Sequence, residues 1–442
     1  MKNIVKIHSK IKKFRKTIEV PGDKSISIRW VMLASIAIGK STASNLLESN
    51  DVKSTINAMK KLGVRITKDK NKYNIYGVGL HGLRIKKNTT IDAGNSGTFA
   101  RLFCGIVSRY SKSIKLIGDK SLSKRDFSRV IKPLSLFGVN IKSNNNKLPL
   151  IITGTDFLRP IYYVEKKGSA QVKSSILFAS LNSPGRTIID CARSRNHTEI
   201  MLKKSLNLPI KIKEKEKFDR LEIIGEKNFK SFNYKIPGDI SSAAFFIVLT
   251  TLSENSKLII KNVNINKTRT GIIEILKMMN GKIKIENKNI YKGELVGDIF
   301  IKSAKNLKSI NCPKSINTKA IDELLIIFLL CAKAKGISRF TGIEELRQKE
   351  SDRLKIASKF LKMIGIKIVE NFNSIKIYGN PKLNLKGNYK IKNFLKDHRV
   401  FMMSCIAALT FGGNFEIHDK SSIKSSFPTF INVLEKVGAK II

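Results

Sequence analysis

The sequence has few cysteines and histidines for its length, and neither residue type is clustered. Its 442 residues include five cysteines and five histidines, and no two cysteines have the CxxC spacing. Structural zinc sites and disulfide frameworks need such clusters, so we expect no metal site and no disulfide. An odd number of widely spaced cysteines is typical of proteins from a reducing compartment.

Long apolar runs and targeting segments are also absent. The longest unbroken apolar run, Leu324 to Ala332, has nine residues, whereas a helix needs about 20 to span a membrane. Residues 1–16 contain no apolar stretch followed by a small-residue cleavage site, so we expect no signal peptide. We therefore expect a cytoplasmic protein without a membrane partner.

Acidic residues are scarce, and the charge imbalance allows two interpretations. Asp and Glu total 34 against 83 Lys and Arg, which gives a formal net charge of +49. A surface that binds nucleic acid or membrane would explain such a charge. However, the lysines are spread along the chain and form no long basic block. We favour a general compositional drift toward Lys, Ile and Asn and expect no nucleic-acid partner, although an anionic substrate would suit a basic cleft.

The sequence does contain enough apolar material for a sizeable core, and it is arranged in an internal repeat. Apolar residues make up 42% of the chain and only 10 prolines interrupt it, which argues against disorder. Small polar residues that lead into an apolar, mostly helical run recur six times, at intervals of 71 to 79 residues. These runs begin near Ser25, Thr98, Val172, Ala243, Asp322 and His398.

A second, amphipathic helix follows each apolar run, and most of these helices end in Gly before a β-branched strand. The amphipathic segments cover residues 51–66, 126–141, 197–212, 268–285, 351–368 and 425–442. A helix that is apolar all round must be surrounded by protein. We therefore expect an α/β fold with helices inside and sheets outside, in which the six repeats are grouped in threes.

The segment PGDKSISIR is typical of an anion site at a helix start. Pro and Gly make a turn, after which Lys24, Ser25 and Arg29 occupy the first turns of a helix. Backbone N–H groups, a hydroxyl and two cations at that position favour an anion. An ordinary helix cap with solvated basic side chains is the alternative.

Polar groups open other buried helices as well. In DAGNSGTFAR, Asn95 precedes Gly97, which allows the backbone to approach a ligand closely. Arg125 precedes a helix in KSLSKRDFSR, and SAQVKSS clusters neutral donors around Gln171 that would suit a sugar-like hydroxyl. Capped turns and a solvated charge pair are the alternatives for these segments.

Three later segments place acids and bases at helix starts. ELRQKESDR contains Lys349, Glu350 and Arg353, and we expect Lys349 and Arg353 on one helix face, unless this is only an exposed charged helix. Asp322 opens the most apolar helix, where burial can raise the pKa of a carboxylate as a general base requires. An acid that only complements the helix dipole is the alternative. DHR places His398 at the sixth buried helix, as an acid/base or, more simply, as a packed core ring.

The pattern of these motifs is more informative than any one of them. Residue types that bind anions lie at the entries of five buried helices. If the N-termini of those helices point at one cleft, the cleft is strongly positive. Such a cleft suits ligands that carry phosphates and carboxylates.

In this order the motifs resemble the EPSP synthase (3-phosphoshikimate 1-carboxyvinyltransferase) family over essentially the full chain. The segments that carry the resemblance are PGDKSISIR, DAGNSGT, GDKSLSKR, SAQVKSS, PGDISSAA, IDE, LRQKESDR and DHR. The resemblance implies a two-domain inside-out barrel, each domain having three βαβαββ repeats around parallel internal helices. It implies that residues 1–20 and 237–442 form one domain and residues 21–236 the other, with the active site in the cleft between them.

The resemblance also implies a reaction that needs no metal or redox cofactor. The enolpyruvyl group of phosphoenolpyruvate moves to the 5-hydroxyl of shikimate 3-phosphate, and phosphate leaves, in the pathway to chorismate and the aromatic amino acids. Members of the family are expected to act as monomers on these two small substrates. Glyphosate mimics phosphoenolpyruvate in this family, and Gly97 offers no methyl group to crowd it, so we expect inhibition.

Roles for individual residues follow from the resemblance alone. The residues matched to shikimate 3-phosphate are Lys24, Ser25, Arg29, Ser169, Ala170, Gln171, Arg195, Asp322 and Lys349. Those matched to phosphoenolpyruvate are Lys24, Asn95, Gly97, Arg125, Gln171, Arg353 and Arg399. Asp322 corresponds to the acceptor of the 5-hydroxyl proton and Glu350 to the proton shuttle at C3, and Lys24 completes the catalytic set.

One position departs from the family pattern, and three different functions stay open. Some members carry a Lys where this sequence has Ser425, and Lys424 is one residue away, so the C-terminal phosphate contact is left unassigned. UDP-N-acetylglucosamine enolpyruvyl transferase shares the fold but uses a Cys on a mobile loop, whereas Cys104 lies within an apolar segment. A nucleic-acid binder and an inactive homologue also stay open, although every expected acid/base position is intact.

Overall fold

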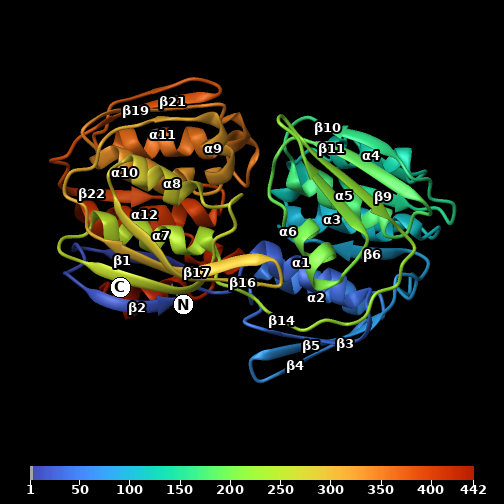
Figure 1. Ribbon diagram of the computed structural model, residues 1–442. Helices are drawn as coiled ribbons and strands as arrows, with labels where there is room; N and C mark the ends of the chain where they lie inside the picture. The colour runs from blue at the N-terminus through green and yellow to red at the C-terminus, as the bar shows by residue number, and fades with distance from the viewer. Residues whose placement is uncertain (1–2) are drawn as a thin grey trace. The chain divides into compact units, whose positions relative to one another are not determined.

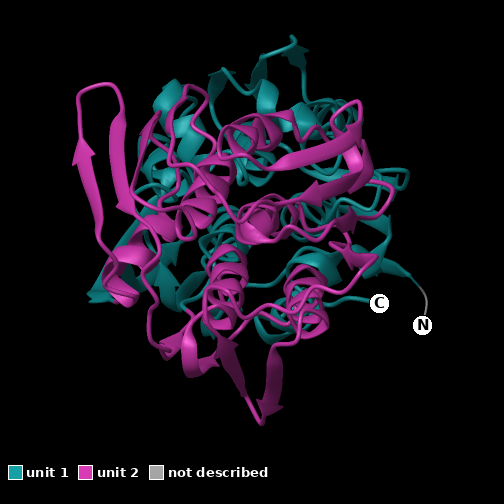
Figure 2. Ribbon diagram, turned by 90° about the vertical axis from the view of Figure 1, so that its right-hand side faces the viewer, with its two compact units in different colours: residues 1–21, 237–291, 295–442 teal, residues 22–236, 292–294 magenta. Residues whose placement is uncertain are grey.

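The computed structural model describes residues 3–442, and contacts within the chain divide it into two compact units (Figure 2). Unit 1 comprises the chain up to Pro21 together with Pro237–Tyr291 and Leu295–Ile442. Unit 2 comprises Gly22–Ile236 and the short turn Lys292–Glu294. Two crossings and one three-residue turn therefore connect the units along the chain.

Unit 2 contains three four-stranded sheets that share one strand pattern (Figure 1). In spatial order, the first two strands of each sheet are parallel, and the third and fourth strands are each antiparallel to the strand before them. The first sheet has β14 (Tyr234–Lys235), β3 (Ile38–Ser44), β5 (Lys72–Val78) and β4 (Arg65–Asp69). The second has β6 (Thr89–Asp92), β7 (Ile114–Ile117), β9 (Lys147–Thr153) and β8 (Asn140–Asn144). The third has β10 (Tyr162–Glu165), β11 (Arg186–Cys191), β13 (Asp219–Ile224) and β12 (Ile210–Glu214).

Unit 1 also contains three sheets. One has β16 (Lys282–Tyr291), β17 (Glu294–Lys302), β15 (Lys257–Asn264) and β2 (Arg15–Glu19). Another has β18 (Asn311–Cys312), β19 (Gly336–Thr341), β21 (Ser374–Gly379) and β20 (Ile368–Glu370). The last has β22 (Leu385–Ile391), β23 (Gly412–His418) and β1 (Ile4–Ile7). Backbone hydrogen bonds of 2.7 and 3.0 Å join Lys6 of β1 to Ile442, so distant ends of the chain complete this sheet.

The helices fall into the two expected classes. The buried helices are α1 (Lys24–Ser35), α3 (Gly97–Ile106) and α5 (Ala170–Ser180) in unit 2, and α7 (Ile240–Leu252), α10 (Leu324–Lys333) and α12 (His398–Phe411) in unit 1. The others are α2 (Asn50–Lys61), α4 (Ser128–Leu136), α6 (His197–Ile200), α8 (Gly271–Met278), α9 (Lys314–Ala320), α11 (Arg353–Met363) and α13 (Phe430–Lys436). All of α12 and nine of the ten residues of α10 are buried, because their apolar faces leave no side for solvent.

At the two crossings the repeats exchange their first strands. The strand β2 pairs in parallel with β15 of unit 1, yet the helix that follows it in sequence, α1, belongs to unit 2. Conversely β14 pairs with β3 in unit 2, and the next helix, α7, belongs to unit 1. The predicted α/β fold of six repeats with internal helices is confirmed, and this exchange explains how a continuous repeat forms two groups of three.

Two local expectations need correction. The segment 197–212 does not form one amphipathic helix, because α6 is a single turn that continues as a π-helix over Met201–Ser205. Lys349 and Arg353 do not share one helix face, because a 3₁₀ turn ends at Gln348 and α11 begins only at Arg353. Within residues 3–442 no helix is long and apolar enough to cross a membrane.

Candidate functional site

In unit 2 the N-terminal turns of three buried helices lie together. Gln171 of α5 donates from Nε2 to the Oγ1 of Thr98 in α3 at 3.0 Å, and its Oε1 accepts from Arg101 at 2.8 Å. Arg29 of α1 donates to the Oγ of Ser174 in α5 at 3.0 Å. Thr98 and Gln171 lie in the first turns of α3 and α5, and Arg29 and Ser174 lie in the second turns of α1 and α5. The three helices therefore run parallel with their N-terminal ends together, and their positive dipole ends favour an anion at this end of the unit.

Side-chain caps hold these helix starts in place. Asp23, Ser96 and Ser169 are the N-caps of α1, α3 and α5, and each accepts a bond from a backbone N–H three residues on. Ser169 is therefore a helix cap, and its contact with shikimate 3-phosphate stays a prediction. Lys24, Gly97 and Ala170 each occupy the first helical position instead, so a helix cap does not account for them.

The cations expected near shikimate 3-phosphate are held by neighbours within unit 2. The Nζ of Lys24 lies 2.9 Å from a carboxylate oxygen of Asp51, and both side chains are mostly buried. Arg29 is 3% exposed and donates to Thr198, Ser174 and the carbonyl of Ser25. The alternative of solvated basic side chains is therefore wrong for Lys24 and Arg29, because both side chains are mostly buried.

The residues expected near phosphoenolpyruvate are grouped around the start of α3. Arg125 donates from Nη2 to the Oδ1 of Asn95 at 3.4 Å, and Asn95 donates to Asp119 at 2.5 Å. A Cβ added to Gly97 would lie 2.9 Å from Nη1 of Arg125 and 3.0 Å from Nη1 of Arg101. A Cβ at Gly97 would therefore require the ends of these two arginine side chains to shift.

Sequence reasoning missed Arg101, the last residue of the DAGNSGTFAR segment. Burial first, and then the neighbouring Arg125, lower the pKa of Arg101 to about 10. A guanidinium whose charge is disfavoured in this way gains from a nearby anion. Its position within an anion-binding motif was the available signal.

In unit 1 a carboxylate at the start of α10 is placed next to two cations. An oxygen of Asp322 lies 3.5 Å from the Nζ of Lys349 and 3.8 Å from Nη1 of Arg353. Arg399 of α12 donates to the backbone carbonyl of Asp322 at 2.5 Å and lies 3.9 Å from the carboxylate of Glu323. Lys349 and Arg353 therefore both lie next to Asp322, although they do not share one helix face.

Arg353 is the centre of this cluster, and Asp397 is a member that sequence reasoning missed. The guanidinium is 1% exposed and bonds to Asp397 at 2.9 and 3.2 Å and to Glu350 at 2.5 Å. Asp397 is also the N-cap of α12 and accepts a bond from Ser351 at 2.8 Å. The residues that unit 1 brings together are Asp322, Lys349, Glu350, Arg353 and Arg399.

The N-terminal ends of the unit 1 helices also meet. Ser241, in the first turn of α7, donates a short hydrogen bond to the carboxylate of Glu323, the N-cap of α10. Arg269 is 2% exposed and donates to Ser241 at 2.8 Å and to Asp239, the N-cap of α7, at 3.2 Å. Within unit 1, the N-terminal ends of α7, α10 and α12 therefore lie together.

His398 and Cys104 are both buried side chains. The ring of His398 is 3% exposed, and its Nδ1 lies 3.0 Å from the Oγ of Ser425, as a packed core ring would. Lys424 is exposed. Cys104 lies inside α3, where burial raises the pKa of its thiol to about 12, so it is not a loop acid. Among residues 3–442, no three or more His, Cys, Asp or Glu side chains are grouped to hold a metal ion.

The Asp397 carboxylate is kept ionised by its neighbour. Burial alone would raise the pKa of this side chain, but the Arg353 guanidinium more than offsets burial and holds the pKa below its usual value. An unfolded Asp has a pKa of about 3.9. The stabilisation from Asp397 is therefore complete above that pH and is lost as the pH falls through the lower, folded-state pKa.

This direction predicts how acid affects stability. We expect the free energy of unfolding to fall on acidification below about pH 4, and we expect a shallower fall in Asp397→Asn. Urea unfolding followed by circular dichroism at a series of pH values measures both slopes. Asp156→Asn, which changes an exposed carboxylate, should keep the slope of the unaltered chain. Equal slopes for Asp397→Asn and the unaltered chain would contradict the assignment.

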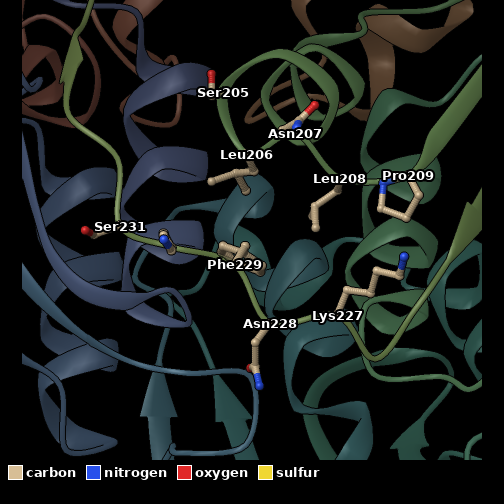
Figure 3. A pocket seen from close by; sticks show the side chains of 10 residues that line it. Ser205, Leu206, Asn207, Leu208, Pro209, Lys227, Asn228, Phe229 and Ser231 are labelled. Carbon is tan, nitrogen blue, oxygen red and sulfur yellow. The ribbon is translucent and has the colours of Figure 1, made fainter.

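One pocket of about 540 Å³ lies elsewhere in unit 2 (Figure 3). Its apolar side chains are Leu206, Leu208 and Phe229, and these come from the segment after the π-helix and from the segment that leads to β14. None of the predicted site residues lines it. This pocket is therefore not part of the helix-end cluster in either unit.

Comparison with known proteins agrees with these features. The family model described as EPSP synthase (3-phosphoshikimate 1-carboxyvinyltransferase) matches residues 8–434. A protein of that name from Thermodesulfovibrio yellowstonii is 42% identical over 97% of this chain and 99% of its own. Another, from Ruthia magnifica, is 41% identical over 96% of this chain and 95% of its own.

Comparison with solved structures indicates the same family. The EPSP synthase of Acinetobacter baumannii has a TM-score of 0.86 and 36% identity, and the match covers 99% of both chains. The enolpyruvyl transferase NikO of Streptomyces tendae has a TM-score of 0.75 at 13% identity over 99% of this chain and 98% of its own, which shows a shared fold. By sequence and by fold, the chain therefore belongs to the EPSP synthase (3-phosphoshikimate 1-carboxyvinyltransferase) family.

Proposed function

We propose that this chain transfers the enolpyruvyl group of phosphoenolpyruvate to the 5-hydroxyl of shikimate 3-phosphate, with release of phosphate. The observation that carries the proposal is the presence of parallel helix N-termini with adjacent cations in each unit, beside the carboxylates of Asp322 and Glu350. Both substrates are anions, so they need cations on their phosphates and carboxylates, and the reaction also needs a proton acceptor and a proton donor.

Two substrates with several phosphate and carboxylate groups would use cations from both clusters. The unit 2 cluster offers Lys24, Arg29 and Arg125, and the unit 1 cluster offers the two carboxylates. We therefore propose one active site to which residues 1–20 and 237–442 contribute as one domain and residues 21–236 as the other. Binding of both substrates would then depend on both domains.

The proposed steps follow from these roles. Asp322 accepts the proton of the 5-hydroxyl while that oxygen forms a bond to C2 of phosphoenolpyruvate, and Glu350 delivers a proton to C3. The tetrahedral intermediate then loses a C3 proton to Glu350 as the C2–O bond to phosphate breaks. The proton held by Asp322 leaves with the phosphate, which balances the reaction. Lys24, Arg125, Arg353 and Arg399 stabilise the charge on phosphate and carboxylate groups.

Location and assembly are part of the same proposal. We propose a cytoplasmic monomer whose partners are the two small-molecule substrates, without nucleic acid or membrane. The +49 charge is the feature that favours a nucleic-acid partner. Salt-sensitive retention on DNA, with no turnover, would favour that alternative.

Phosphate release from the purified chain tests the reaction. We expect release only when shikimate 3-phosphate and phosphoenolpyruvate are both present, because attack by the 5-hydroxyl precedes loss of phosphate. Omission of either substrate is the control. Release with UDP-N-acetylglucosamine in place of shikimate 3-phosphate would favour the sister activity, and no release with either acceptor would refute the transferase.

A further inference from the structure

The guanidinium of Arg29 is held by three neutral oxygens. Nε donates to the Oγ1 of Thr198 at 2.7 Å, Nη2 donates to the Oγ of Ser174 at 3.0 Å, and Nη1 donates to the carbonyl of Ser25 at 3.0 Å. Thr198 is fully buried and Ser174 is 1% exposed. These three acceptors fix the orientation of the guanidinium, as the directional N–H groups of an arginine allow.

The hydroxyl protons in this group can be assigned by counting. The Oγ of Ser174 donates its one proton to the carbonyl of Ala170 at 2.6 Å. The 2.7 Å contact between Ser174 and Thr198 must then have Thr198 as the donor. Thr198 therefore accepts from Arg29 and donates to Ser174, so its hydroxyl joins the other two side chains.

His197 and Glu199, the neighbours of Thr198 in sequence, also make buried contacts. Glu199 pairs with Lys173 of α5 at 2.6 Å, and both side chains are 2% exposed. His197 lies 2.6 Å from Glu294, with both side chains at 0% exposure, and Glu294 belongs to the turn that joins β16 and β17. In that turn a Cβ at Gly293 would meet Ile200 at 2.9 Å, so the turn packs closely on α6.

We propose that His197, Thr198 and Glu199, here called the α6 anchor, position Arg29 and the preceding Arg195 for the phosphate of shikimate 3-phosphate. The inference rests on the proposed function and on the resemblance, which matches both arginines to shikimate 3-phosphate. Thr198 acts directly on Arg29. His197 and Glu199 fix the first turn of α6, and with it the backbone from which Arg195 projects two residues earlier.

The turn at residues 292–294 extends the anchor to a hairpin whose strands are assigned mostly to unit 1. Glu294 is the residue of that hairpin that contacts His197. The α6 anchor therefore contacts α1, α5 and the β16–β17 turn. Such a set can hold two guanidinium groups at a fixed spacing, which recognition of a phosphate by two arginines requires.

Two substitutions at Thr198 distinguish the effect of its hydroxyl on the position of Arg29 from the effect of its methyl group on packing. Thr198→Val keeps the shape but removes the hydroxyl, so Arg29 Nε loses an acceptor. Thr198→Ser keeps the hydroxyl and loses a methyl group. Thr250→Val in α7 is the matched control, because its buried hydroxyl bonds only a backbone carbonyl, that of Phe246 at 2.8 Å. The measurements are calorimetric titration with shikimate 3-phosphate, the KM for phosphoenolpyruvate and thermal unfolding of the full chain.

We expect Thr198→Val to weaken binding of shikimate 3-phosphate at least about tenfold, and Thr198→Ser to restore it to within about threefold. The KM for phosphoenolpyruvate should change less than about twofold in both. Unchanged binding in Thr198→Val, or a serine variant as weak as the valine variant, would overturn the anchor alone. If the unaltered chain neither binds shikimate 3-phosphate nor releases phosphate, the proposed function fails and the anchor fails with it.

Discussion

Replacing Asp322 with asparagine should lower the rate of phosphate release by about 100- to 10,000-fold. Asparagine has nearly the same shape but cannot accept a proton at neutral pH. The carboxylate lies 3.5 Å from the Nζ of Lys349 and 3.8 Å from Nη1 of Arg353. Phosphate release under saturating substrates measures the loss of kcat.

Glu345→Gln is the matched control for this experiment. Its carboxylate lies 3.9 Å from the same Lys349 but its side chain is 54% exposed, so it carries no proposed role and contributes a solvent-screened ion pair. We expect its kcat to stay within about threefold of the unaltered chain. A kcat for Asp322→Asn as high as that of Glu345→Gln would exclude Asp322 as the proton acceptor.

The sequence could predict features that depend on local pattern. The apolar run at 324–332 had to be surrounded by protein, and all nine of its residues are buried in α10. The repeat of polar entry and apolar run predicted six buried helix starts, and these are the starts of α1, α3, α5, α7, α10 and α12. Because a helix start fixes which residues lie on its first turn, the positions of Lys24 and Gly97 followed as well.

Features that depend on contacts between distant segments could not be predicted in this way. The exchange of β2 and β14 between the two groups of sheets leaves no local signal, because both are ordinary short strands. Asp397 is part of the DHR segment, and only the fold brings it 2.9 Å from Arg353, 44 residues earlier. Thr198 likewise meets Arg29 across 169 residues. The break between Lys349 and α11 was missed because the charge spacing alone suited a helix.

Replacing Arg353 with leucine should cost about 3–5 kcal/mol of stability in unit 1, the cost of removing one partner from a buried ion pair. The side chain is 1% exposed, and its loss would leave Asp397, which is 0% exposed, without its closest cation, and Glu350 without its 2.5 Å partner. Amide hydrogen exchange, measured peptide by peptide over α10, α11 and α12, reports this loss.

The single tryptophan provides an internal reference in the same sample. Trp30 is fully buried in α1 of unit 2, so its fluorescence reports the unit that does not contain Arg353. We expect the protection of unit 1 amides to fall more than that of α1 and α5. Arg353→Lys keeps a positive charge but loses the two-pronged contact with Asp397, and it should cost less than leucine.

Arg347→Leu is the matched control for the loss of an arginine. Arg347 also pairs with two carboxylates, Asp352 at 2.9 Å and Glu370 at 2.6 Å, but these side chains are 34% and 21% exposed. Water can solvate them once the guanidinium is gone, so the expected cost is less than half that of Arg353→Leu. Equal losses in the two variants would mean that burial of Asp397 does not set the cost, and that the cluster around Arg353 is held together by packing instead.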